Sequence, residues 1–152
     1  MRLDDDMRRV VREQSLGFVA TVCPDGTPNL SPKGTTVVWG DEHLAFLHIC
    51  SPGTVTNLLA NPAIEINVVD PIVRKGYRFK GTGEVLTEGP VRDEVLDWFA
   101  RERGTDTGRV QAVVLVHVDT AAAVISPAYD TGASEHDIIG RWREHHLGLH
   151  GR

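Results

Sequence analysis

The sequence has little cysteine, few aromatic residues and no long apolar run. Cys23 and Cys50 are the only cysteines among 152 residues, and aromatic residues make up 6%. Each cysteine ends an apolar, strand-like run, which favours reduced thiols over a disulfide framework, and their spacing fits no zinc motif. No run approaches the roughly 20 apolar residues that span a bilayer, and no apolar signal-peptide core follows the charged N-terminus. We therefore expect a cytoplasmic protein without membrane partners.

Positive charge is also in short supply. The chain has 16 Lys and Arg residues against 21 Asp and Glu residues, which gives a net charge of -5. This balance disfavours a general binder of nucleic acids or anionic membranes. A basic run over 74–80 is interleaved with aromatics only at Tyr77 and Phe79, so no nucleic-acid partner is expected and binding through Arg74, Arg78 and Lys80 is kept as a minor alternative. Any site that binds an anion must therefore depend on a few residues close together rather than on the net charge of the chain.

The common catalytic motifs are absent. The sequence contains no nucleophile elbow, paired-cysteine site, phosphate loop or dinucleotide fingerprint. Its seven histidines lack the spacing of a metal site, because the adjacent His145 and His146 would face different sides of a helix. We therefore predict no metal, and the catalytic residues remain unknown at this level.

The length and the hydrophobic content of the chain predict one domain spanning residues 1–152. Hydrophobic residues make up 41% of the chain, which is enough for a packed core. We expect that core over about residues 16–126, with 127–152 as a C-terminal tail or helix.

Periodicity predicts short strands joined by turns. Strands are expected over 18–23, 28–39, 43–49, 63–69, 73–86, 111–119 and, more weakly, 121–126. Helices are expected over 4–14, 54–60, 90–103 and, in the polar C-terminal part, 134–147. Most of the early strand connections are too short for helical crossovers. The fold class is therefore mainly β, a small antiparallel barrel of about six strands with flanking helices.

The stretch Ser51-Pro52-Gly53-Thr54 predicts that a helix begins directly after an apolar strand. Such a start carries unpaired backbone N–H groups and the positive end of the helix dipole, so it suits an anion such as phosphate. The alternative is that Ser51 only caps a structural helix.

Three further features each have a structural and a functional interpretation. In Ser31-Pro32-Lys33-Gly34-Thr35-Thr36, proline and glycine interrupt a strand, which indicates either an edge strand with an exposed lysine or a backbone that leaves its ladder to contact a planar ligand. Lys75 and Tyr77 share one strand face, which is either solvated or in contact with ligand. His48 is either a satisfied core or boundary histidine or a catalytic one.

Together these residues resemble the pyridoxamine 5'-phosphate oxidase-like family of FMN-binding proteins. The resemblance rests on the order of features between residues 16 and 86: the Asp25-Gly26 turn, the Ser-Pro-Lys-Gly-Thr strand, the apolar run before Ser51, Asn57-Leu58, Asn61-Pro62 and a Gly-x-Gly-Glu strand end. It implies an antiparallel six-stranded split β-barrel of the FMN-binding type. It also implies a homodimer with FMN bound in clefts between the subunits.

The resemblance further implies which residues bind FMN. Those near the ring and ribityl chain would be Ser31, Pro32, Lys33, Gly34, Thr35 and Thr36. Those near the chain and phosphate would be His48, Ile49, Ser51, Thr54 and Asn57. A later strand would contribute Lys75, Gly76 and Tyr77 near the ring.

The activity implied is an FMN-dependent oxidoreductase that acts on a small molecule, with a reduced nicotinamide or another donor. The alternative is a binding module that holds FMN, a deazaflavin or haem without turnover. Vitamin-processing members carry an Arg-Lys pair where this chain has Gly53-Thr54, so either the positive charge comes from Lys33, Lys75 or Arg74 or the phosphate is held more weakly. Arg143-Glu144-His145 matches the Arg-x-His of their substrate segment but lies in an expected helix, so oxidation of pyridoxamine phosphate is not expected.

Overall fold

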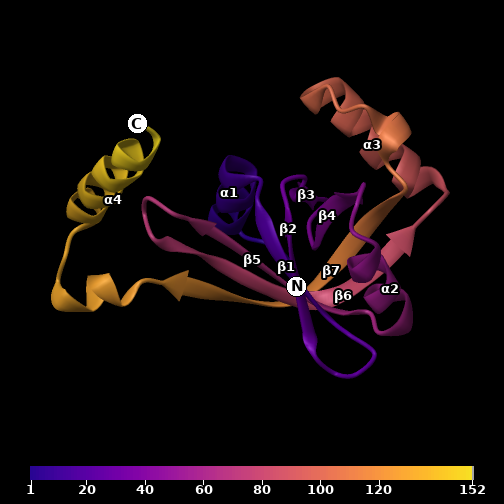
Figure 1. Ribbon diagram of the computed structural model, residues 1–152, viewed down its shortest axis with the longest axis horizontal. Helices are drawn as coiled ribbons and strands as arrows, with labels where there is room; N and C mark the ends of the chain where they lie inside the picture. Colours follow the sequence, from indigo (N-terminus) through magenta and orange to yellow (C-terminus); the bar gives the residue numbers. More distant parts are fainter. Residues whose placement is uncertain (152) are drawn as a thin grey trace.

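Seven strands form one antiparallel sheet, with helices around it (Figure 1). The computed structural model describes residues 1–151. The strands are β1 (Gly17–Val22), β2 (Pro28–Lys33), β3 (Val37–Trp39), β4 (His43–His48), β5 (Ala63–Asp70), β6 (Lys75–Leu86) and β7 (Ala112–Ile125). The helices are α1 (Asp5–Gln14), α2 (Pro52–Ala60), α3 (Pro90–Arg103) and α4 (Glu135–His150), with 3-10 turns η1 (Thr107–Arg109) and η2 (Pro127–Thr131). The sheet order is β2-β1-β5-β6-β7-β4-β3, and all the neighbouring strands pair antiparallel.

The prediction of six strands is wrong because the expected strand over 28–39 breaks in two. Its halves, β2 and β3, form the two opposite edges of the sheet, so the barrel stays split rather than closed. Two threonine hydroxyls hold the turn between them: Thr36 Oγ1 donates to the Lys33 carbonyl at 2.8 Å, and Thr35 Oγ1 accepts from the Leu47 N–H at 2.9 Å. Side chains thus satisfy backbone groups that would otherwise pair along a strand.

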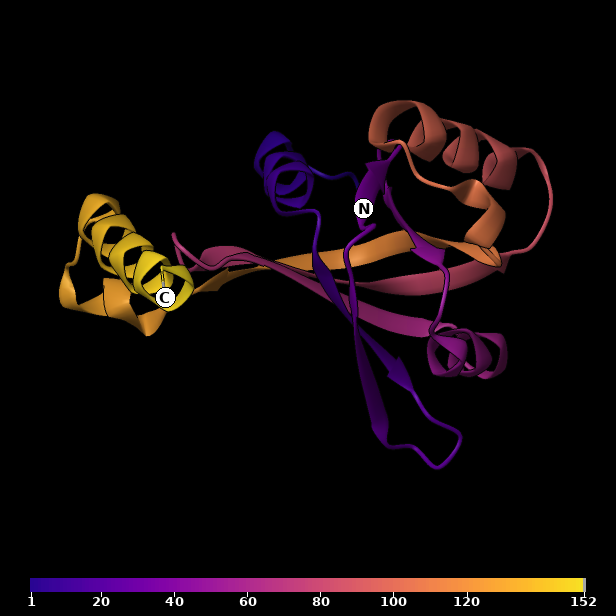
Figure 2. The ribbon, with the colours of Figure 1, turned by 45° about the horizontal axis from the view of Figure 1, so that its top comes forward.

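The last two expected strands, 111–119 and 121–126, form one strand, β7, which pairs with β6 across a bulge. The register between β6 and β7 shifts between Lys80 and Gly81, where a Cβ on Gly81 would lie only 1.9 Å from the His117 carbonyl oxygen. β7 continues through residue 120 because β6 pairs with it on both sides of this bulge. The long strands carry the chain out to α4 at one end of the molecule (Figure 2).

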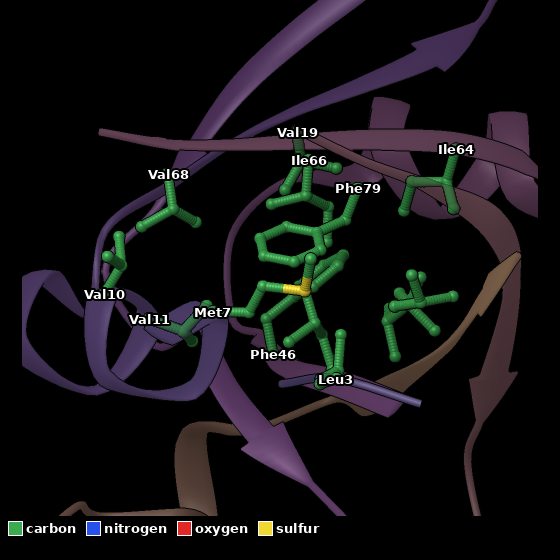
Figure 3. Close-up of a cluster of buried hydrophobic side chains, with 14 of the residues drawn as sticks. Leu3, Met7, Val10, Val11, Val19, Phe46, Ile64, Ile66, Val68 and Phe79 are labelled. Atoms are coloured by element: carbon green, nitrogen blue, oxygen red, sulfur yellow. The ribbon is translucent and has the colours of Figure 1, made fainter. Parts of the chain in front are cut away.

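The core lies inside the curved sheet. In its larger part, α1 packs Met7, Val10 and Val11 against barrel residues that include Phe46 and Phe79 (Figure 3). The apolar spacing predicted this face of α1, and Asp4 caps the helix through its side chain. A second cluster lies under α3, whose bounds match the prediction.

The C-terminal tail is a helix, as expected for this segment. A capping box between Ser134 and Asp137 starts α4, and Arg74 stacks on Trp142 with its guanidinium carbon 3.7 Å from the ring centroid. Both cysteines are free thiols. Within residues 1–151, no helix has the length and apolar character needed to cross a membrane.

Candidate functional site

The junction between β4 and α2 forms an open helix start. Ser51 occupies the N-cap position and Pro52 the first turn, but the Ser51 side chain makes no capping hydrogen bond in the described chain. The interpretation of Ser51 as a side-chain cap is therefore wrong. The first backbone N–H groups of α2 have no partner within the helix, and the helix dipole adds positive potential there.

Two buried polar residues follow in the same helix. Thr54 is 1% exposed, and its Oγ1 has no hydrogen-bond partner among the described residues. Asn57 is buried as well, but its Nδ2 donates to Thr21 Oγ1 at 3.0 Å and makes a weaker contact with Cys23 Sγ at 3.6 Å. Asn57 therefore connects α2 to β1. The Thr54 hydroxyl, in contrast, is buried without a hydrogen-bond partner among the described residues, which is rare in folded proteins.

Lys33 is buried, which contradicts the interpretation of an exposed edge lysine. Its side chain is 6% exposed, and its Nζ lies 5.9 Å from the centroid of the Phe46 ring. No carboxylate of residues 1–151 lies within ion-pair distance of it. Burial lowers the pKa of the Lys33 ammonium, with an opposing effect from Cys50.

His48 ends β4 beside this lysine. It is buried, and its Nδ1 has no hydrogen-bond partner in the described part of the chain. Burial lowers the pKa of His48, the charge of Lys33 lowers it further, and a hydrogen bond to Gln111 opposes both. Gln111 also donates its backbone N–H to the His48 carbonyl at 2.9 Å and its Nε2 to the Ile49 carbonyl at 3.0 Å. His48 is thus not the fully satisfied core histidine of the structural interpretation.

A polar stripe on β2 faces the start of α2. Asn29, Ser31 and Lys33 alternate along the strand and share one face, while Pro32 is exposed. Asn29 donates weakly to Thr21 Oγ1 at 3.5 Å, and its Oδ1 lies 3.9 Å from where a Cβ of Gly53 would stand. The sequence reasoning missed Asn29, Thr21 and Gln111. The period of two in β2 could have found Asn29, whereas the other two depend on tertiary contacts.

The turn over residues 34–36, between β2 and β3, offers few free side-chain groups to a ligand. Gly34 is exposed, and the hydroxyls of Thr35 and Thr36 already bond to backbone groups. These residues therefore place the buried Lys33 at the bend between the two sheet edges.

The structure does not bring Lys75, Gly76 and Tyr77 to this site within one chain. β6 meets α2 at Gly83, where an added Cβ would lie 3.0 Å from Leu58 of the helix. Lys75 opens the same strand eight residues earlier, which is roughly 25 Å away at the usual strand rise. These three residues therefore lie away from α2, and their grouping with Lys33 around one ligand stays a prediction.

At their own end of β6, these residues already have partners. Lys75 Nζ lies 3.0 Å from a Glu135 carboxylate oxygen, and Tyr77 donates its hydroxyl to Asp6 at 2.6 Å. This bond raises the pKa of Tyr77 to about 12 and lowers that of Asp6. Gly76 is required by packing, since a Cβ there would lie 2.1 Å from the Val68 carbonyl oxygen. A cavity of about 240 Å³ lies among α1, β6 and the start of α4 and includes all three residues in its lining.

The site at α2 is chemically suited to an anionic ligand. Backbone donors and the Thr54 hydroxyl are available at the helix start, and no acidic residue lies in its first turn. Of the three cations considered for this role, Lys33 is the one close to His48 and Cys50, whereas Lys75 and Arg74 are engaged with α4.

Comparisons with known proteins agree with this architecture. The family model described as pyridoxamine 5'-phosphate oxidase matches residues 3–125. The crystal structure of HupZ from Group A Streptococcus is 33% identical, with a TM-score of 0.73, and the match covers 82% of this chain and 95% of that chain. No curated protein matches the chain.

More distant structures share the fold alone. An F420 reductase is 23% identical with a TM-score of 0.61, over 79% of this chain and 98% of that chain. An FMN-binding protein from Syntrophomonas wolfei is 15% identical with a TM-score of 0.65, over 79% of this chain and 84% of that chain. From the extent of the family match and the HupZ identity, the chain belongs to the pyridoxamine 5'-phosphate oxidase-like family of split barrels.

Proposed function

We propose that the protein binds FMN at the start of α2 and acts as an FMN-dependent oxidoreductase on a small molecule. The observation that carries this proposal is the buried, unpartnered Thr54 hydroxyl at a helix start with open backbone donors. A phosphate would satisfy both at once. The S. wolfei neighbour, which is described as FMN-binding, supports a flavin as the ligand.

The residues around the start of α2 would each contact or support the bound FMN. The N–H groups at the start of α2 and Thr54 Oγ1 bind the phosphate, and Asn57 keeps α2 in place through Thr21. Lys33 supplies the positive charge that the first turn of α2 lacks, and its ammonium favours negative charge on a ligand ring. FMN, when bound, supplies the redox chemistry itself.

His48 would act as a neutral polar group. Because its pKa lies below the ordinary value, the imidazole is uncharged at neutral pH and can accept or donate a hydrogen bond through Nδ1. Gln111 fixes the carbonyls of His48 and Ile49 and so orients the end of β4.

We also propose that the working unit is a homodimer in the cytoplasm. Lys75, Gly76 and Tyr77 lie along β6 away from α2, and we propose that a second copy supplies them to the ligand. Such an arrangement places the ligand in a cleft between protomers. The two free thiols are consistent with a reducing compartment.

Anaerobic reduction separates an enzyme from a carrier. The FMN-loaded protein is mixed with NADH or NADPH without oxygen, and the visible flavin absorbance is followed, with dithionite as the control reductant. Loss of absorbance with a nicotinamide supports the oxidoreductase. Absorbance that only dithionite removes contradicts it and favours a module that holds the cofactor without turnover.

A further inference from the structure

A separate hollow lies over β3, between α1 and α3. Figures 1 and 2 show these two helices on either side of the β3 edge. The hollow has a volume of about 350 Å³, within the range of small-molecule sites, and is lined by Arg8, Arg12, Val37, Val38, Trp98, Glu102 and Arg103. None of these residues belongs to the α2 site.

The rim of the hollow carries uncompensated positive charge. Arg12 makes no ion pair with any of residues 1–151, and Arg103 donates only to the neutral Ser15 Oγ at 3.1 Å. The single acidic lining residue, Glu102, is already paired with Arg101 at 3.0 Å. On a chain with a net charge of -5, two guanidinium groups at one hollow that make no ion pair with a described carboxylate are a local exception.

The wall and floor of the hollow are apolar. Trp98 packs edge-on against Phe99 with ring centroids 5.1 Å apart, which holds the indole in place. The Arg103 guanidinium lies 5.7 Å from the Trp98 ring centroid, and Val37 of β3 is buried beneath. A flat apolar body could therefore lie against Trp98 with an anionic end at the arginines.

Helix electrostatics explain part of this arrangement. Arg12 and Arg103 each lie in the last turn of a helix, where a cation interacts favourably with the dipole. That effect accounts for the positive charges but not for an aromatic wall and a hollow between two helix ends. The combination is typical of a binding site.

We propose that this hollow binds a small planar carboxylate, with the carboxylate on Arg12 and Arg103 and the apolar body on Trp98. Planar guanidinium groups bind carboxylates through paired N–H donors, so the site would prefer a carboxylate over a neutral molecule of the same shape. The inference does not depend on the proposed flavin site, because the two share no residue.

Isothermal titration with 2-naphthoate and its neutral analogue 2-naphthylmethanol tests this proposal on the purified protein. We expect the carboxylate to bind at least about tenfold more tightly, as charge-assisted hydrogen bonds would give. Arg12→Gln and Arg103→Gln should each weaken naphthoate binding by about tenfold. Arg143→Gln on α4 is the control, because Arg143 is exposed and lies outside the hollow, and it should change the affinity by less than about twofold.

Three results would overturn the proposal: no naphthoate binding, equal binding of the neutral analogue, or unchanged affinity in Arg12→Gln. Arg12→Gln should not disturb folding, because Arg12 is exposed and its side chain makes no described hydrogen bond or ion pair. FMN binding in the same variants should stay unchanged, so a failure here is distinguishable from a failure of the flavin proposal.

Discussion

The ammonium of Lys33 lies 5.9 Å from the centroid of the Phe46 ring, in the wall of the split barrel. Phe46 is fully buried and Lys33 is 6% exposed, so the cation lies against the core without a carboxylate among the described residues. Burying a charge in this way costs stability unless a partner compensates it. An anionic ligand at the start of α2 would be that partner.

Replacing Lys33 by Met should stabilise the protein and weaken its binding of FMN. Methionine keeps the length of the side chain and removes the buried charge, so we expect the free energy of unfolding to rise by about 1 kcal/mol. The dissociation constant for FMN should rise about tenfold or more. Urea denaturation and flavin fluorescence titration measure the two quantities.

Lys80→Met is the control for the expected gain in stability and loss of FMN affinity. Lys80 is exposed on the outer face of the sheet and pairs only with Glu65 at 3.5 Å, so the change should alter both quantities little. If Lys33→Met lost stability and kept its FMN affinity, Lys33 would be a structural residue.

The Thr54 hydroxyl should matter for FMN but not for riboflavin, which lacks the phosphate. Thr54→Val keeps the branched shape and removes the unpaired hydroxyl, so stability should stay equal or rise. We expect FMN affinity to fall roughly fivefold to tenfold and riboflavin affinity to stay the same. The exposed Thr56→Val on the same helix serves as control, and an equal loss for both flavins would remove Thr54 from the phosphate site.

His48 should make the protein less stable in mild acid. The pKa of His48 in the folded state lies below its ordinary value of 6.5, so the unfolded chain binds the proton first as pH falls. The stability that His48 contributes is therefore complete above about pH 6.5 and is lost as pH drops through the lowered pKa. Urea denaturation at about pH 7.5 and pH 5.5 should show a smaller loss in His48→Gln than in the parent.

His43 has a lowered pKa too, so part of the acid loss should remain in that variant. His136→Gln, at an exposed position of α4, is the matched control and should behave as the parent does. An equal loss of stability at about pH 5.5 in the parent and in His48→Gln would show that His48 does not contribute to the acid sensitivity.

Much of the fold followed from local patterns. The helices α1 and α3 and the strand β5 were predictable because apolar spacing, turn residues and helix ends all act within a few residues. The break of 28–39 into two edge strands was not, since it depends on the hydroxyl of Thr35 bonding to Leu47 on another strand. Tertiary pairing likewise joined the two weak strands after residue 111 into β7.

The candidate site also combines features that local sequence predicts with features that depend on tertiary structure. The start of α2 was predictable from Ser51-Pro52-Gly53-Thr54, because helix starts have a strong local signature. The burial of Lys33 and the distance of Lys75 depend on how the sheet curves, which no local pattern encodes. A resemblance that groups residues across a dimer also says nothing about which protomer supplies each one.

Mixing two defective variants tests the proposed dimer site. If Lys33 comes from one protomer and Lys75 from the other, Lys33→Ala and Lys75→Ala should each weaken FMN binding in their own homodimers. Mixed dimers made by refolding equal amounts together should regain about a quarter of the sites at parental affinity. No regain would show that both residues act within one chain or that Lys75 only pairs with Glu135.

The visible spectrum of the purified protein, recorded before and after incubation with FMN and removal of the excess, shows whether the protein holds FMN, as proposed for the start of α2 and Lys33. We expect a yellow protein that retains an equimolar amount of FMN. A colourless protein that retains no FMN after incubation would contradict this proposal.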